Sequence, residues 1–148
     1  MFGELADGLM KLHYEIPADD LTYAGEASSS VKKVLVQLGI NPVQIKKAAV
    51  SMYEAEINAV IHGHGGAADI EIGNGRIFIC IEDKGPGIPD LELAMQEGWS
   101  TASDEVREMG FGAGMGLPNI KRYADKLDIE TETGKGTKVM ITVMYPNT

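Results

Sequence analysis

The chain has 148 residues, of which 44% are apolar and 24% charged, and this composition is typical of one soluble domain with a single hydrophobic core. It carries 22 acidic against 13 basic residues, a formal net charge of -9, so its overall field repels nucleic acid and anionic membranes. No apolar run approaches the ~20 residues that span a bilayer, and the acidic N-terminus has no basic leader. We therefore expect a single cytoplasmic domain over 1–148 that neither binds nucleic acid nor enters a membrane.

Cysteine and glycine usage narrow the search for a function. Cys80 is the single cysteine, which excludes an internal disulfide and a zinc site built on several thiolates. Its neighbours, IFICIED, predict a core position in a strand rather than a reactive thiol. Glycine is the unusual residue, since the chain has 18 and seven of them lie between Gly85 and Gly116. That segment is where we expect the function.

The first half of the chain has the pattern of one strand, two helices and a hairpin. A loosely alternating run stops at Pro17, which predicts a short strand at an edge of the sheet. Asn41 followed by Pro42 is a helix cap with proline in the first turn. The predicted elements are a strand over 11–16, a helix from Asp19 or Asp20 to Leu38, a second helix from Asn41 to His62, and a hairpin of strands 68–72 and 76–81.

The second half begins with a long irregular segment. Residues 91–114 show no firm periodicity, which in a small domain is typical of a functional lid, here over about 90–115. A helix over 117–127 and a hairpin of strands 128–133 and 137–145 are expected to follow. This order lacks a regular βαβ alternation and predicts an α+β fold, a two-layer sandwich with helices on one face of a mixed, mostly antiparallel sheet.

Polar side chains form a stripe along the second predicted helix. Their spacing of four, three, four and four residues places them on one face, while the flanking positions are almost all apolar. A helix of this kind should be largely buried, so the polar stripe needs partners. A ligand pocket would supply them, and a solvated face is the alternative. At the helix end, the histidine is expected to cap or pack rather than bind a ligand. The stripe consists of Lys47, Ser51, Glu54, Asn58 and His62.

Two glycine-containing turns follow predicted strands. Asp83 stands directly after a regular strand and is followed by Gly85 and Gly87. This pattern fixes an acceptor beside bare backbone that a flat ring can approach, although a plain turn has the same residues. The sequence GKGT at 134–137, taken alone, predicts a hairpin turn.

Glycines at 110, 112, 114 and 116 lead directly into a predicted helix. Bare amides at a helix N-terminus favour an anion such as phosphate. The run lacks the Gly-Lys-Ser/Thr ending of a Walker loop, and no strand precedes it as a Rossmann fingerprint requires. A glycine hinge without a ligand is the alternative.

Taken in order, EAEINAVIHG, DKGPGIPD, GFGAGMGLPNI and GKGT resemble the N box and the three glycine boxes of the GHKL superfamily of ATPases and kinases. The resemblance covers the chain from about residue 48 to its end and implies a sandwich that encloses ATP under a mobile lid. Among stand-alone members, the chain is similar to anti-sigma factors and stress-switch serine kinases. Those proteins phosphorylate a serine on a small STAS-type antagonist and exchange partners according to nucleotide state.

The resemblance also implies roles for single residues. Asn58 would hold Mg²⁺ through its amide oxygen, and Glu54 would be the general base that accepts a proton from the attacking hydroxyl or water. Asp83 would accept a hydrogen bond from the adenine amino group, with support from Thr137. The remaining implied ATP-binding residues are Gly85, Gly87, Gly112, Gly114, Met115, Gly116, Leu117 and, as a nearby cation, Lys121.

The function implied by the resemblance is that of an ATP- and Mg²⁺-dependent protein serine/threonine kinase. It would transfer the γ-phosphate to a serine of a STAS-type antagonist, and a sigma factor or a phosphatase regulator would be the further partner. Glu108 and Met109 stand where such kinases often carry an arginine. Two alternatives therefore stay open, a catalytically weak nucleotide-dependent partner-binding module and a simple ATPase. A homodimer through the exposed sheet edge is compatible with the sequence, and Trp99 is either a partner contact or a lid anchor.

Overall fold

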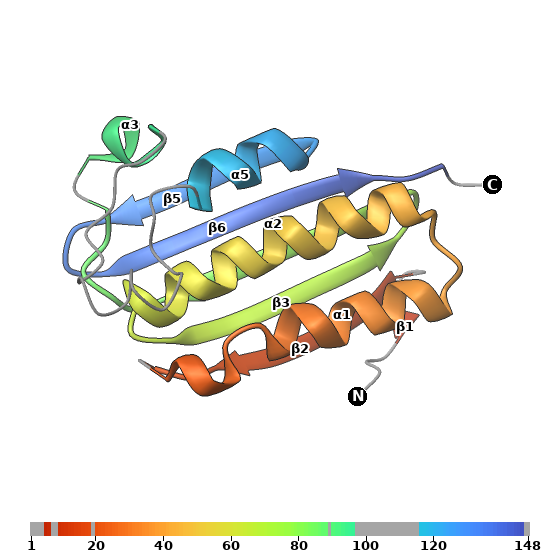
Figure 1. The fold of residues 1–148 in the computed structure, drawn as a ribbon, viewed down its shortest axis with the longest axis horizontal. Coiled ribbons are helices and arrows are strands. Elements are labelled where there is room, and N and C mark those ends of the chain that lie inside the picture. The colour runs from red at the N-terminus through yellow and green to blue at the C-terminus, as the bar shows by residue number, and fades with distance from the viewer. Residues whose placement is uncertain (1–4, 7–8, 19, 89, 97–115, 147–148) are drawn as a thin grey trace.

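The computed structural model describes residues 5–6, 9–18, 20–88, 90–96 and 116–146. Six strands form one antiparallel sheet in the order β1-β2-β3-β4-β6-β5. The helices lie together on one face of it, as Figure 1 shows, so the predicted two-layer α+β sandwich is confirmed. The strands are β1 (Leu5–Ala6), β2 (Leu9–Ile16), β3 (Gly66–Gly73), β4 (Arg76–Asp83), β5 (Lys126–Glu132) and β6 (Gly136–Met144). The helices are η1 (Leu21–Tyr23), α1 (Glu26–Gln37), α2 (Pro42–Ile61), α3 (Leu91–Ala94) and α5 (Gly116–Tyr123).

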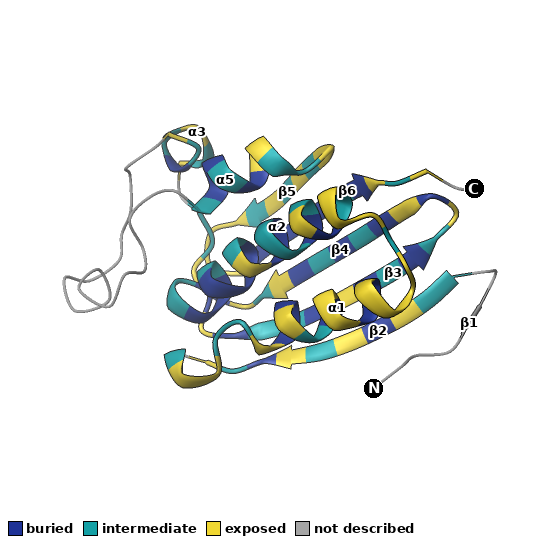
Figure 2. Ribbon diagram, turned by 45° about the vertical axis from the view of Figure 1, so that its right-hand side comes forward, coloured by how far each residue is buried: buried dark blue, intermediate teal, exposed yellow. Residues whose placement is uncertain are grey.

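The core lies between the sheet and the helices. Along β4, Ile77, Ile79 and Ile81 are buried, whereas Phe78 and Cys80 alternate with them and are half-buried (Figure 2). Because successive side chains of a strand point to opposite faces, Phe78 and Cys80 lie on the face away from the helices. Cys80 is thus in the predicted strand, but the expectation of a core position is wrong. Every residue of the run IFICI is apolar, so the sequence does not show which face of the strand the helices cover.

The long helix α2 crosses the sheet and begins as predicted. The side chain of Asn41 accepts a hydrogen bond from the Val43 N–H at 2.9 Å, and Pro42 occupies the first turn. The helix ends at Ile61 with His62 as its C-cap, where the His62 N–H donates to the Asn58 carbonyl at 2.8 Å. The capping role expected of His62 is therefore confirmed.

Helix α1 starts later than expected, and its N-terminus is capped from another helix. Asp20 accepts from the Thr22 N–H at 2.9 Å and begins the short η1 instead. The N-cap of α1 is Gly25, which has a left-handed φ of +94°. Glycine has no side chain that could accept hydrogen bonds from the first backbone N–H groups of the helix. The buried Glu56 of α2 supplies the acceptor, since its carboxylate takes the N–H groups of Gly25, Ala27 and Ser28 at 2.9, 3.2 and 2.9 Å.

The last helix is shorter than predicted. It was expected over 117–127, whereas α5 ends at Tyr123 and β5 begins at Lys126. Asp125 joins the sheet because its N–H donates to the Thr142 carbonyl at 2.9 Å and its carboxylate accepts from the Met144 N–H at 2.7 Å. Pairing with β6 therefore overrides the apolar spacing that suggested a longer helix.

No helix in the described part of the chain is both long and apolar enough to cross a membrane.

Candidate functional site

Asp83 is held rigidly at the end of β4. Its Oδ1 accepts hydrogen bonds from the Gly85 N–H at 3.0 Å and the Thr137 N–H at 3.2 Å. Burial raises the pKa of the half-buried carboxyl, against the opposing pull of those two N–H groups and of the charges of His64 and His62. Both of these bonds use one oxygen, so the other is not needed to fix the side chain.

Glycines allow close backbone packing around Asp83. A Cβ on Gly63, just past α2, would collide with the Asp83 carboxyl group, and a Cβ on Gly136 would collide with the Asp83 carbonyl. Gly85 packs against the backbone of Gly63 at 2.6 Å from a notional Cβ to the Gly63 Cα. Gly63 and Gly136 were missed as site residues, although HGHGG and GKGT were visible as glycine-rich turns.

Gly87 serves a different contact. Its notional Cβ would lie 2.6 Å from the Glu132 carbonyl oxygen, and the adjacent Pro86 carbonyl accepts the Gly134 N–H at 2.9 Å. The loop after β4 therefore rests on the β5–β6 turn. Close packing within the chain already requires glycine at Gly85 and Gly87, whether or not a ring approaches them.

Thr137 is connected to this loop through a second threonine. It is 7% exposed, and its hydroxyl lies 3.0 Å from the hydroxyl of Thr131. The Thr131 hydroxyl in turn accepts the Ile88 N–H at 2.8 Å. Thr137 thus contacts Asp83 through its backbone N–H, and its expected part in adenine binding stays a prediction, while Thr131 is a supporting residue that no sequence motif indicated.

The polar stripe of α2 faces α5. A Cβ on Gly116, the first residue of α5, would lie 2.9 Å from Nδ2 and 3.1 Å from Oδ1 of Asn58. At the other end of the stripe, Lys47 lies 3.6 Å from the Asp125 carboxylate. The structure therefore brings the N box and the start of the helix after the second glycine box together.

Glu54 lies one turn before Asn58 on the same face and is half-buried. Burial raises the pKa of its carboxyl. Next to the site, burial lowers the pKa of His62, and the negative charge of Asp83 opposes that shift. A desolvated carboxyl with a raised pKa is the type of group that catalytic sites use as a base.

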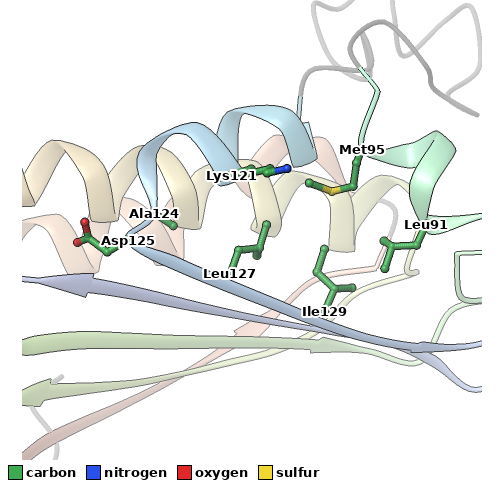
Figure 3. A pocket seen from close by; sticks show the side chains of 7 residues that line it. All are labelled: Leu91, Met95, Lys121, Ala124, Asp125, Leu127 and Ile129. Carbon is green, nitrogen blue, oxygen red and sulfur yellow. The ribbon is translucent and has the colours of Figure 1, made fainter.

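Two of the other expected residues have different surroundings. Leu117 is buried in the hydrophobic core, so its side chain is structural. Lys121 is exposed on α5 and lines a pocket of about 490 Å³ between α3, α5 and β5, shown in Figure 3. None of Glu54, Asn58 and Asp83 lines this pocket with Lys121. The other side chains of the pocket are Leu91, Met95, Ala124, Asp125, Leu127 and Ile129.

Several predictions fall on residues that the structure does not describe. Gly112, Gly114 and Met115, most of the proposed lid over 90–115, Trp99 and the positions Glu108 and Met109 lie outside the described ranges. They stay predictions.

The chemistry of Asn58 fits a Mg²⁺ ion that is shared with a nucleotide. An amide oxygen is a hard ligand, and this ion takes few protein ligands when phosphates and water supply the others. The described residues contain no group of three or more His, Cys, Asp or Glu that could hold a metal ion.

Comparison with known proteins gives consistent results. Residues 17–143 match the family model described as the histidine kinase-like ATPase domain. The anti-sigma F factor of Clostridium beijerinckii is 29% identical over 93% of this chain and 94% of its own length. The serine/threonine-protein kinase RsbT of Bacillus subtilis is 30% identical over 81% of this chain and 85% of its own length.

Solved structures show the same fold. The RsbU and RsbW domains of Rv1364c from Mycobacterium tuberculosis superpose with a TM-score of 0.62 at 16% identity, covering 91% of this chain and 32% of that longer one. The SiaB–SiaC complex of Pseudomonas aeruginosa gives a TM-score of 0.57 at 13% identity over 89% of each chain. The protein belongs to the histidine kinase-like ATPase domain family, in the branch that contains the anti-sigma F factors and RsbT.

Proposed function

We propose that the protein is a serine/threonine-protein kinase that transfers the γ-phosphate of Mg-ATP to a serine of a STAS-type partner protein. The observation that carries the proposal is the placement of three groups. The amide of Asn58 lies against Gly116, Glu54 is one turn away on the same helix face, and Asp83 is fixed at the end of β4. The relative RsbT is a serine/threonine-protein kinase, which supports the same activity.

Asp83 would recognise the purine. Its Oδ1 is engaged by two backbone N–H groups, so Oδ2 is the oxygen that would accept a hydrogen bond from the adenine amino group. Thr137 orients the carboxylate through its N–H and is itself buried against Thr131. A purine acceptor that is fixed before binding costs little ordering entropy when ATP arrives.

Asn58 and Gly116 would meet the phosphates. Gly116 is the N-terminal residue of an eight-residue helix, and the nearby Asn58 amide oxygen would be the Mg²⁺ ligand. When bound, the ion supplies neutralisation of the charge on the β- and γ-phosphates. The glycines at 112 and 114, with Met115, would extend this cradle.

Glu54 would act as the general base. The serine oxygen attacks the γ-phosphorus, the bond to the β–γ bridging oxygen breaks to leave ADP, and the Glu54 carboxylate takes the serine proton. Its raised pKa makes it a better proton acceptor than a solvated carboxylate. Partner exchange with a sigma factor or a phosphatase regulator would follow from the phosphorylation state of the STAS-type protein.

The test is phosphotransfer from labelled ATP to a purified STAS-domain protein. We expect ADP and phosphoserine in equal amounts, and a loss of transfer of at least ~100-fold in Glu54→Gln with ATP binding retained. Glu26→Gln, an exposed change on α1, is the matched control and should transfer normally. Nucleotide-dependent partner capture without phosphoserine would favour the binding module. Phosphate release without an acceptor would favour the ATPase.

A further inference from the structure

The pocket between α3, α5 and β5 is lined, apart from Lys121, by residues that have no part in the proposed ATP site. Its volume is about 490 Å³, and it is open to solvent (Figure 3). A volume of this size is in the range that bound ligands fill. Five of the seven lining side chains are apolar, namely Leu91, Met95, Ala124, Leu127 and Ile129.

The two charged residues of the pocket differ in how they are engaged. The Asp125 carboxylate lies 3.6 Å from Lys47 and accepts the Met144 N–H at 2.7 Å, so α2 and β6 already use its charge. Lys121 forms no ion pair with another residue of the described ranges, and its side chain points towards Met95 across the pocket. The charge that remains for an occupant is therefore positive, which favours apolar groups accompanied by a carboxylate.

One wall of the pocket is the edge strand β5. This strand pairs with β6 on one side, and no other described strand lies along its other side (Figure 1). Leu127 and Ile129 line the pocket, whereas Lys126, Asp128 and Glu130 alternate with them and are exposed. Every second residue of an edge strand turns its N–H and C=O groups outward. The pocket therefore lies beside backbone groups that a further strand could use.

We propose that β5 binds an extended segment of a partner protein, which adds a strand to the sheet and places alternate apolar side chains in the pocket. Main-chain hydrogen bonds supply the affinity at sites of this kind, and the pocket selects the side chains. A carboxylate on the apolar side of the segment would meet Lys121, and basic residues on its other side would lie beside Asp128 and Glu130. The recognised class is thus a segment that alternates apolar and basic residues, with one acidic residue on its apolar side.

The shape of the site favours this occupant over a small molecule. A pocket usually encloses about 70–90% of the surface of a small ligand, whereas this one is open along β5. A segment held by main-chain hydrogen bonds needs no such enclosure. The opposite edge of the sheet is β1, which has only two residues, so β5 with seven is the longer template.

The loop after β4 limits the length of the pairing. Gly87 packs against the Glu132 carbonyl, and the Ile88 N–H donates to the Thr131 hydroxyl at 2.8 Å. These contacts cover the last residues of β5. The added strand is therefore placed along residues 126–130, where the pocket opens.

Binding of a designed peptide to the full chain tests the proposal. The probe is a fluorescent six-residue peptide in which three basic residues alternate with valine, leucine and glutamate. Its control has the same composition with the alternation broken. At an ionic strength of about 0.15 M, we expect saturable binding of the probe alone and slower amide hydrogen exchange at residues 126–130. An absence of saturable binding, equal binding of the control, or protection at β1 instead of β5 overturns the proposal.

Methylation of the peptide backbone tests strand addition itself. Edge pairing uses every second N–H of the bound segment. N-methylation of one alternate set of peptide residues should therefore abolish binding, and N-methylation of the other set should be tolerated. Equal binding of the two methylated peptides contradicts an added strand.

Charge reversal at Lys121 tests the part played by the pocket. Lys121→Glu should weaken the probe at least about fivefold and should strengthen a peptide that carries lysine in place of glutamate. Lys33→Glu makes the same change at an exposed position of α1 and should leave both peptides within about twofold of the wild type. Equal effects of the two substitutions would overturn the assignment of the carboxylate to Lys121. All these measurements are made without ATP or a STAS-type protein, so they are independent of phosphotransfer.

Discussion

Replacement of Glu56 by glutamine tests whether one buried carboxylate holds α1 against α2. Glu56 is 1% exposed, and its two oxygens accept the N–H groups of Gly25, Ala27 and Ser28. Glutamine has the same shape but one acceptor oxygen, so its NH₂ group would face the N–H groups that the lost oxygen accepted. The backbone donors of the α1 N-terminus cannot be removed, so the loss has no compensation within the chain.

The expected magnitude follows from those contacts. A hydrogen bond to a charged group contributes ~1.5–3 kcal/mol, and removal of the charge also loses its attraction to the helix N-terminus, ~0.3–1 kcal/mol. We expect Glu56→Gln to lower the free energy of unfolding by about 3 kcal/mol. For a domain of this size that corresponds to a fall in Tm of roughly 6–12 °C.

Urea denaturation and calorimetry at neutral pH measure this change. Glu26→Gln is the matched control, because Glu26 lies exposed in the first turn of the same helix and should change stability by less than ~1 kcal/mol. Equal effects of the two substitutions, or a Glu56→Gln variant as stable as the wild type, would refute the view that Glu56 is the cap of α1.

Three predictions concern the nucleotide site. Asp83→Asn should weaken ATP binding by about 1–3 kcal/mol in calorimetry. The amide oxygen must accept the two backbone N–H groups, so the NH₂ group then faces the adenine amino group, donor against donor. Unchanged affinity would show that the purine does not bind at Asp83. Gly116→Ala should lower Mg-ATP affinity, because a methyl group 2.9 Å from the Asn58 amide displaces that side chain, whereas Gly39→Ala meets no neighbour, has a positive φ, and should lower stability with binding intact. Burial raises the pKa of Glu54 in the folded chain. A carboxyl with such a raised pKa stabilises the folded state at low pH, and this stabilisation is lost as the pH rises through the pKa of the folded state. Glu54→Gln should therefore raise Tm at neutral pH while it abolishes transfer, and in the wild type the transfer rate should fall as the pH drops through the pKa of Glu54; a lower Tm contradicts this account.

Local signals in the sequence were sufficient for most of the fold. The hairpin between β3 and β4 is set by an Asn-Gly turn in which Asn74 and Gly75 have φ of +54° and +77°, the geometry that such turns require. Asn41 and Pro42 likewise begin α2 through contacts within four residues. These elements depend on near neighbours, so a single sequence can reveal them.

Features that depend on distant contacts were not predicted. The start of α1 depends on Glu56, about thirty residues away in the sequence, and a lone glutamate in a helix has no recognisable capping pattern. The end of α5 depends on the pairing of Asp125 with β6. Cys80 was placed on the wrong face because only the assembled layers decide which side of β4 the helices cover.

The candidate site combines both kinds of information. Glu54, Asn58 and Asp83 could be identified from the order of the motifs along the chain. The reason for the glycines around them is visible only in the fold. Gly63, Gly85 and Gly136 let the end of α2, the loop after β4 and the start of β6 converge on Asp83 at distances that no side chain would allow. That convergence desolvates the carboxyl and raises its pKa, a cost that a purely structural loop could avoid with a serine or asparagine. Recognition of a purine amino group, as proposed above, would give the charge of Asp83 a use.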